Sequence, residues 1–154
     1  MALYAAPGIA DACLQAQDRE GCDVNLLLYA CYAAACGQRL EASQIADMIA
    51  VSADWRRDMV TPLRALRRRA AGALRERLLE AELLAEQGQQ ELMWVQRSPP
   101  GDWDLGTVAP SGSRGQILRH NLAGVAAASG CAPGGLEGLA ALVDVALGGL
   151  LPNL

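Results

Sequence analysis

Two aspartates at helical spacing are the first residues in this chain that could do chemistry. In Asp54-Trp55-Arg56-Arg57-Asp58 the carboxylates stand four residues apart, so a helix places both on one face. Helical prenyl-transferring enzymes use such D-x-x-x-D pairs to hold Mg²⁺ bound to diphosphate, usually with a second acidic cluster. The sequence offers no matching second cluster, and an acid in a first helical turn also suits the helix dipole. We therefore predict no catalytic residue, no metal site and no cofactor, and an enzyme is disfavoured.

A polar pocket is a second possibility. Asn25 stands at the mouth of an apolar helix, where its side chain needs a hydrogen-bond partner. Arg56, Arg67 or the indole N–H of Trp55 would serve. If these groups meet, they form with Asp23 a pocket in which an arginine takes an anionic ligand. The alternative is that Asp23 and Asn25 only cap the helix and fill its first turn.

Histidine and cysteine chemistry is not indicated. His120 has no serine or cysteine nucleophile placed beside it by the sequence, so we interpret it as a partly buried structural residue. An odd number of cysteines, no C-x-x-C and an ample apolar core argue against a disulfide scaffold, and one histidine argues against a zinc site. The cysteines are Cys13, Cys22, Cys31, Cys36 and Cys131.

One buried helix is expected to position the other elements. The stretch from Asp23 to Cys36 is apolar on every face, which is typical of a helix surrounded by other elements. Asp23 can cap its first turn, and Gly37 can end it. With 154 residues and no strand pattern, the chain is predicted to be a single all-α domain over 1–154. We expect a compact bundle of six to seven helices around this central one.

The other helices follow from hydrophobic periodicity. An apolar stripe at a mean step near 3.6 residues runs from Trp55 to Val95. One rod over 52–96 would be about 67 Å long, too long for a compact domain of this size. We expect a kink at Pro62 and a break at Ala70-Ala71-Gly72. The expected helices are 7–19, 23–36, 42–50, 52–70, 73–96, 114–129 and one after Pro133-Gly134-Gly135, with a loop over about 97–113.

Charge is concentrated in the long helical segment. Residues 56–77 carry eight arginines and a net charge of +6, and residues 78–91 carry four glutamates and no base. Helical phase points Arg57, Arg64 and Arg68 to solvent. It puts Arg56 and Arg67 at the border of the apolar stripe, where a side chain can reach inward and pair. The favoured interpretation is a solvated face that pairs with the acidic helix after it and with the acidic N-terminal third of the chain. Nucleic-acid binding is disfavoured, because the chain has a pI near 4.9 and no aromatic residues interleave with the arginines.

The leading hypothesis is a non-enzymatic protein that binds a protein partner or its own copy. Laid antiparallel against a second copy, the basic and acidic parts of the segment would complement each other in a two-fold dimer. Such a dimer should loosen as salt rises. The candidate surface is Arg57, Arg64, Arg68, Glu80, Glu82 and Glu86. No apolar run is long enough to span a membrane, and no secretory signal is evident, so we expect a soluble cytoplasmic protein.

Several short motifs occur in a characteristic order. They are Leu3-Tyr4, Ala12-Cys13-Leu14-Gln15, Asp23-Val24-Asn25-Leu26-Leu27-Leu28, Trp55-Arg56, Pro62-Leu63-Arg64-Ala65-Leu66-Arg67-Arg68 and Glu80-Ala81-Glu82-Leu83-Leu84-Ala85-Glu86. Over about residues 3–92 the chain resembles a family of small proteobacterial proteins of unknown function. The resemblance implies kinship with that bacterial family and an all-α fold, and it implies no activity. Gln15-Ala16-Gln17 departs from the family pattern, with alanine where leucine is usual.

Overall fold

The computed structural model describes residues 4–96, 111–131 and 136–150, and each regular element in these ranges is a helix. The predicted all-α class is confirmed. The elements are α1 (Ile9–Glu20), α2 (Val24–Ala35), α3 (Ala42–Trp55), the π-helical segment η1 (Arg56–Val60), α4 (Thr61–Arg69), α5 (Gly72–Gln96), α6 (Ser111–Ser129) and α7 (Leu136–Leu150).

The chain divides into two compact units. The first comprises residues 1–45 and 101–154, and so contains α1, α2, α6 and α7. The second comprises residues 46–100, and contains most of α3 with η1, α4 and α5. Compactness is a property of contacts and does not establish independent folding, so the single domain over 1–154 stays a prediction.

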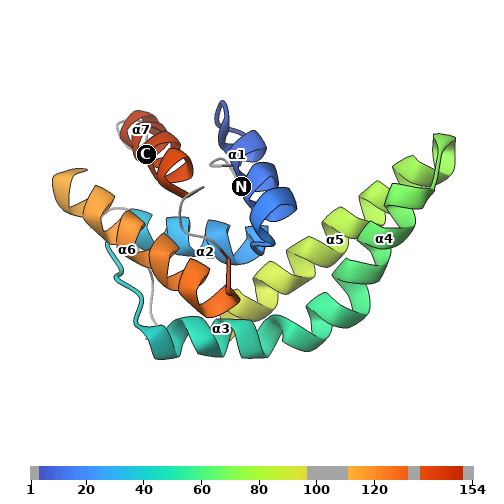
Figure 1. Ribbon diagram of the computed structural model, residues 1–154, viewed down its shortest axis with the longest axis horizontal. Helices are drawn as coiled ribbons and strands as arrows, with labels where there is room; N and C mark the ends of the chain where they lie inside the picture. Colours follow the sequence, from blue (N-terminus) through green and yellow to red (C-terminus); the bar gives the residue numbers. More distant parts are fainter. Residues whose placement is uncertain (1–3, 97–110, 132–135, 151–154) are drawn as a thin grey trace. The chain divides into compact units, whose positions relative to one another are not determined.

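Helix α2 is the buried helix of the first unit. Ten of its twelve residues are buried, including Leu27 at 0% exposure. Asp23 caps the helix as predicted, because its Oδ1 accepts a hydrogen bond of 2.9 Å from the N–H of Asn25. Helices α1 and α6 both contact α2, and α7 contacts α1 and α6 (Figure 1). The apolar residues of this unit therefore surround a helix that has no polar face.

A disulfide joins Cys22 to Cys131 within the first unit, with the Cα atoms 5.7 Å apart. The sequence argument against a disulfide scaffold did not foresee this bond. Cys22 lies between α1 and α2, and Cys131 follows α6, 109 residues later in the chain. Only the tertiary packing of α6 on α2 brings them together, so spacing in the sequence gave no signal. Cys13, Cys31 and Cys36 are buried and outside the disulfide, as expected of small apolar side chains.

The second unit is built from a helix that changes pitch and then folds back. Pro62 has no N–H, so the carbonyl four residues before it loses its helical partner. The chain responds with a π-helical turn just before the proline, in which Thr61 N–H donates to the Arg56 carbonyl. The predicted break is confirmed at Ala70, whose backbone is extended, and Gly72 adopts a positive φ of 56°. Helices α4 and α5 then run side by side as a hairpin (Figure 1).

Helix ends differ from the predictions by a few residues. Helix α3 runs to Trp55 where the pattern ended at 50, since η1 and α4 continue it almost without a break. Helix α6 begins at Ser111, three residues before the expected start. The rest of the predicted loop, residues 97–110, lies outside the described residues. Each helix of the described ranges is too short or too polar to cross a bilayer.

Candidate functional site

The residues of the predicted polar pocket belong to different units. Asp23 and Asn25 are buried in the first unit, at 7% and 5% exposure. Trp55, Arg56 and Arg67 belong to the second unit. A pocket shared by these residues stays a prediction.

Trp55 fastens the end of α3 to α5. Its indole Nε1–H donates a hydrogen bond of 2.8 Å to the carbonyl of Ala85. The ring lies over Gly88, where an added Cβ would come within 2.7 Å of ring carbon Cζ2. The indole donor that we expected to be available to Asn25 is therefore used inside the second unit.

Four charged residues form an ion network between α4 and α5. Arg64 donates from Nε to Glu82 at 2.9 Å and from Nη2 to Glu86 at 2.5 Å. Arg67 donates from Nε to the other oxygen of Glu82. The expectation that Arg64 points to solvent is wrong, since its side chain is only 20% exposed. Arg67 reaches inward from the border of the stripe, as expected, and contacts Glu82. The predicted pairing of the arginine run with the following acidic helix, α5, is thereby confirmed.

The network fixes the charge of Glu82. Burial alone would raise the pKa of this carboxyl, because the side chain is only 5% exposed. Hydrogen bonds from Arg67 and Arg64, and their positive charges, outweigh burial and hold the pKa of Glu82 below its usual value. Burial lowers the pKa of the Arg64 guanidinium, but its contacts with Glu82 and Glu86 together outweigh burial and raise it. The hydrogen bond to Glu82 raises the pKa of Arg67. The network is thus fully ionised near neutral pH.

Both aspartates of the D-x-x-x-D motif form ion pairs with Arg57. Arg57 donates to Asp54 at 2.7 Å and to Asp58 at 2.8 Å, and all three side chains are well exposed. The hydrogen bond from Arg57 is the largest cause that lowers the pKa of Asp58. No cluster of three or more metal-ligating side chains occurs among the residues that the structure describes. Both carboxylates are engaged in a surface ion pair, an arrangement that requires no metal.

Other members of the predicted interaction surface lie on exposed parts of the second unit. Glu80 accepts from Arg77 at 2.9 Å, and Arg68 is exposed on α4. The predicted surface therefore divides in two, with Arg64, Glu82 and Glu86 engaged between helices and the others at the surface. That the arginine run does not bind nucleic acid stays a prediction.

Asn121 holds α6 to α2, and sequence reasoning missed it. Its Oδ1 accepts from Leu40 N–H at 2.8 Å, and its Nδ2 donates to the carbonyls of Gln38 and Ala30. His120 beside it lies 3.0 Å from the Leu40 carbonyl, which agrees with the structural role expected of it. The available signal was an asparagine within the apolar stripe of this helix, and Asn121 is fully buried. Its partners, however, lie more than 80 residues away in the chain.

Large apolar side chains are exposed from the end of α3 to α5. Met59 and Leu66 are two helical turns apart, as Leu74 and Leu92 are five turns apart, so each pair shares a helix side. The ring of Trp55 lies on Gly88, one helical turn before Leu92. We call this surface the hairpin face. Its members are Trp55, Met59, Leu66, Leu74, Leu84 and Leu92, with exposures of 36%, 42%, 52%, 62%, 67% and 36%.

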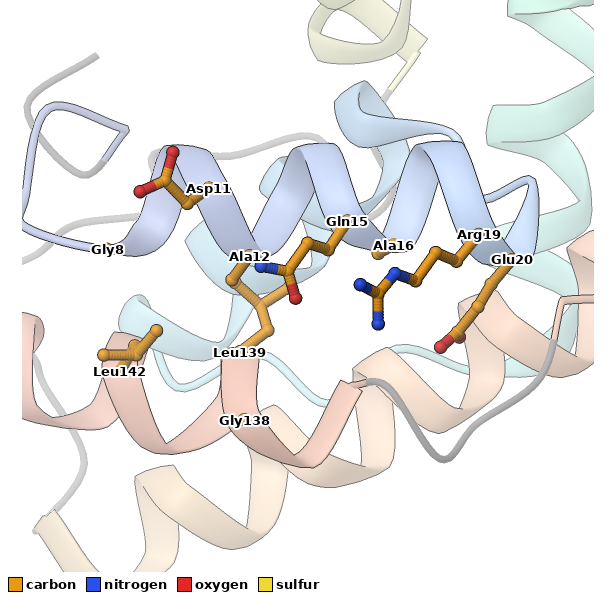
Figure 2. A pocket seen from close by; sticks show the side chains of 10 residues that line it. All are labelled: Gly8, Asp11, Ala12, Gln15, Ala16, Arg19, Glu20, Gly138, Leu139 and Leu142. Carbon is orange, nitrogen blue, oxygen red and sulfur yellow. The ribbon is translucent and has the colours of Figure 1, made fainter.

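A cavity of about 290 Å³ lies between α1 and α7 in the first unit. Gln15, Arg19 and Glu20 extend from α1 along the side that faces α7, whereas the carboxylate of Asp11 turns away (Figure 2). Helical spacing from the buried residues Ile9, Cys13 and Ala16 puts Gln15 and Arg19 on another side of α1. They are indeed exposed, but α7 approaches the same side and turns it into the wall of a cavity.

Fold and site together define an all-helical protein with a buried helix in one unit and an ion-paired helical hairpin in the other. Residues 1–93 match the family model described as protein of unknown function (DUF2390), and the chain belongs to this family. The family resemblance stated from the motifs is thereby confirmed. No curated protein and no solved structure matches the chain.

Proposed function

We propose that this protein acts through protein contacts rather than catalysis, and that its second unit pairs with a second copy of the chain through the hairpin face. The observation that carries the proposal is the exposure of the hairpin face. We infer that these side chains form one patch, and exposed apolar patches are typical of interaction sites. Leu74 and Leu84 are each more than 60% exposed, although both are large aliphatic side chains on a regular helix.

The hairpin face is rigid, which favours recognition. Trp55 is held by its hydrogen bond to Ala85, and the two helices are fixed to each other by Arg64, Arg67 and Glu82. A preformed surface loses little conformational entropy when a partner covers it. The ion network therefore supports the apolar face from within the hairpin.

The charges of the two helices favour a second copy as the partner. Once Arg64, Arg67, Glu82 and Glu86 are set aside as paired within the hairpin, α4 keeps two arginines and no acid. Helix α5 keeps three glutamates against two arginines, a net charge of −1. A two-fold axis parallel to the hairpin places α4 of one copy over α5 of the other, so that opposite charges meet. An axis across the hairpin would place α4 over α4, where like charges meet. The first arrangement is a four-helix bundle with an apolar interior.

The test is the oligomeric state of the full chain, measured by light scattering on a sizing column over a range of concentrations. We expect the wild type to be a dimer, and Leu84→Glu to be a monomer because it places a charge inside the interface. Leu66→Glu, on the other helix of the same face, should behave alike. Leu14→Glu alters a leucine of α1 that is 44% exposed, and should remain dimeric.

Circular dichroism checks that each variant keeps its helix content. We expect no loss, because Leu66 and Leu84 are too exposed for the change to unfold the chain. A monomeric wild type at every concentration would contradict the proposal. So would a Leu84→Glu variant that stays as dimeric as Leu14→Glu.

We also propose that the protein is cytoplasmic, as expected from the sequence. In a reducing compartment Cys22 and Cys131 should be thiols, since glutathione and thioredoxin keep such pairs reduced. Rapid alkylation of intact cells followed by mass spectrometry would measure their state. A fully oxidised pair would place the protein in an oxidising compartment instead.

A further inference from the structure

The end of the α4–α5 hairpin carries a concentrated positive charge. We call residues 68–77 the hairpin tip, since α4 ends and α5 begins within them (Figure 1). The tip has a net charge of +3 in a chain whose total charge is −4. Its charged residues are Arg68, Arg69, Arg75, Glu76 and Arg77. All of them are exposed, so the tip presents its arginines to whatever molecule meets this end of the hairpin.

The position of Arg75 is not explained by helix stability. The arginines in the last turn of α4 suit the negative end of the dipole of that helix. Arg75, in contrast, is the first charged residue of α5, and the first turn of α5 contains no acid. An acid would be the stabilising choice at this positive helix end. The arginines of both helices thus place positive charge on one surface, which is complementary to an extended anionic surface.

An uncharged segment lies between the arginines of the two helices. Residues 70–74 are three alanines, one glycine and one leucine. A segment without charge can enter the headgroup layer of a bilayer, whereas a charged one would first lose its water. A nucleic acid favours aromatic side chains that stack on bases, or polar side chains that bond to them. The hairpin tip has no aromatic, amide or hydroxyl side chain, so its composition favours a lipid surface.

We propose that the hairpin tip docks on the surface of a membrane that contains anionic phospholipid. The arginines contact lipid phosphate and carboxylate groups, and the uncharged segment lies between the headgroups. The contact is peripheral and needs no membrane-spanning helix. Each arginine near such a surface contributes about fivefold in affinity. Apart from Leu74, the tip shares no residue with the hairpin face, so lipid binding and dimerisation can fail separately.

Co-sedimentation of the full chain with lipid vesicles tests the proposal. Vesicles of three parts phosphatidylcholine to one part phosphatidylserine should bind the protein at low salt, and vesicles of phosphatidylcholine alone should not. Binding should weaken as salt rises, because interactions between exposed charges are screened.

Two triple variants with the same change of charge locate the contact. The first combines Arg68→Gln, Arg69→Gln and Arg75→Gln. It should bind the phosphatidylserine vesicles about a hundredfold more weakly than the wild type. The second, the control, replaces three exposed arginines of the first unit through Arg19→Gln, Arg39→Gln and Arg119→Gln. It should bind as the wild type does.

A pair of single substitutions tests the uncharged segment. Ala71→Glu places an acid at the tip and should weaken vesicle binding about fivefold or more. Ala71→Gln has the same size without the charge and should bind nearly as the wild type does. Ala71 is exposed and lies between the two helices, so neither change should lower helix content by circular dichroism. Equal binding by the two variants would exclude a contact at the tip.

Three further results would overturn the proposal. The first is no difference between vesicles with and without phosphatidylserine. The second is equal loss of binding in both triple variants, which attributes binding to the net charge of the chain. The third is tighter binding of duplex or single-stranded DNA than of phosphatidylserine vesicles at the same salt, lost in the tip variant, which assigns the tip to nucleic acid.

Discussion

The two units use apolar and charged residues in opposite ways. In the first unit Leu27, Leu118 and Leu122 are fully buried, and the helix that carries Leu27 has no charged residue at all. In the second unit the ion network of Glu82 lies between the helices, and leucines lie outside. Helix α4, which the structure describes in full, contains no buried residue. The first unit has the organisation of an ordinary core, whereas the second has the organisation of a surface that another molecule covers.

The largest expected difference between the units comes from leucine truncation. Leu27→Ala removes a fully buried side chain and should lower the free energy of unfolding by about 2–5 kcal/mol. Leu84→Ala, at 67% exposure, should change it by less than about 0.5 kcal/mol in the monomer. Chemical denaturation at low protein concentration measures both. Equal effects would mean that the two leucines do not differ in burial.

Reduction should weaken the first unit alone. The Cys22–Cys131 disulfide closes a long loop, and its loss should cost about 2–4 kcal/mol. Hydrogen exchange with and without reductant separates the units, because peptides of α2 and α6 should lose protection while those of α4 and α5 should not. Loss of protection over the whole chain would show that the units unfold together.

Loss of charge at Glu82 should weaken the second unit. Glu82→Gln removes charge-assisted hydrogen bonds to Arg64 and Arg67 and should cost about 1–3 kcal/mol at neutral pH. The folded pKa of Glu82 lies below its usual value of 4.5, so its ionised form stabilises the fold fully above that pH. This contribution is lost as pH falls through the folded pKa. Denaturation midpoints of wild type and variant should therefore converge in acid, and a constant gap would exclude the network as its source.

The smallest effect should come from the exposed ion pair of the same unit. Arg57→Gln breaks contacts with Asp54 and Asp58 that are fully open to solvent. Such pairs are screened and contribute little. The denaturation midpoint should match wild type, which makes this variant the control for Glu82→Gln. A clear loss of stability would mean that Arg57 has a structural role its exposure does not indicate.

Local chemistry made much of the fold predictable. The Asp23 cap, the break at Ala70 and the buried helix α2 depend on residues within a few positions of one another. The hydrogen bonds of Asn121 and the disulfide at Cys22 depend on residues more than 80 positions away, and no local pattern encodes them.

The hairpin face was only half predictable. The apolar stripe from Trp55 to Val95 is present, as expected. However, the charged residues at the border of the stripe, rather than the stripe itself, lie between α4 and α5. Leu66 and Leu74 are consequently exposed, and Arg64 and Glu82 are not. Periodicity identifies an apolar side of each helix but does not say whether the chain itself or another molecule covers it.

The most direct test of the account is hydroxyl-radical footprinting of the full chain at concentrations below and above its association midpoint. We expect oxidation of Met59, Leu74 and Leu84 to fall as concentration rises, while Leu14 in the first unit stays equally reactive. That result would mean that a second copy covers the hairpin face. Unchanged oxidation of all four residues at every concentration would contradict the account.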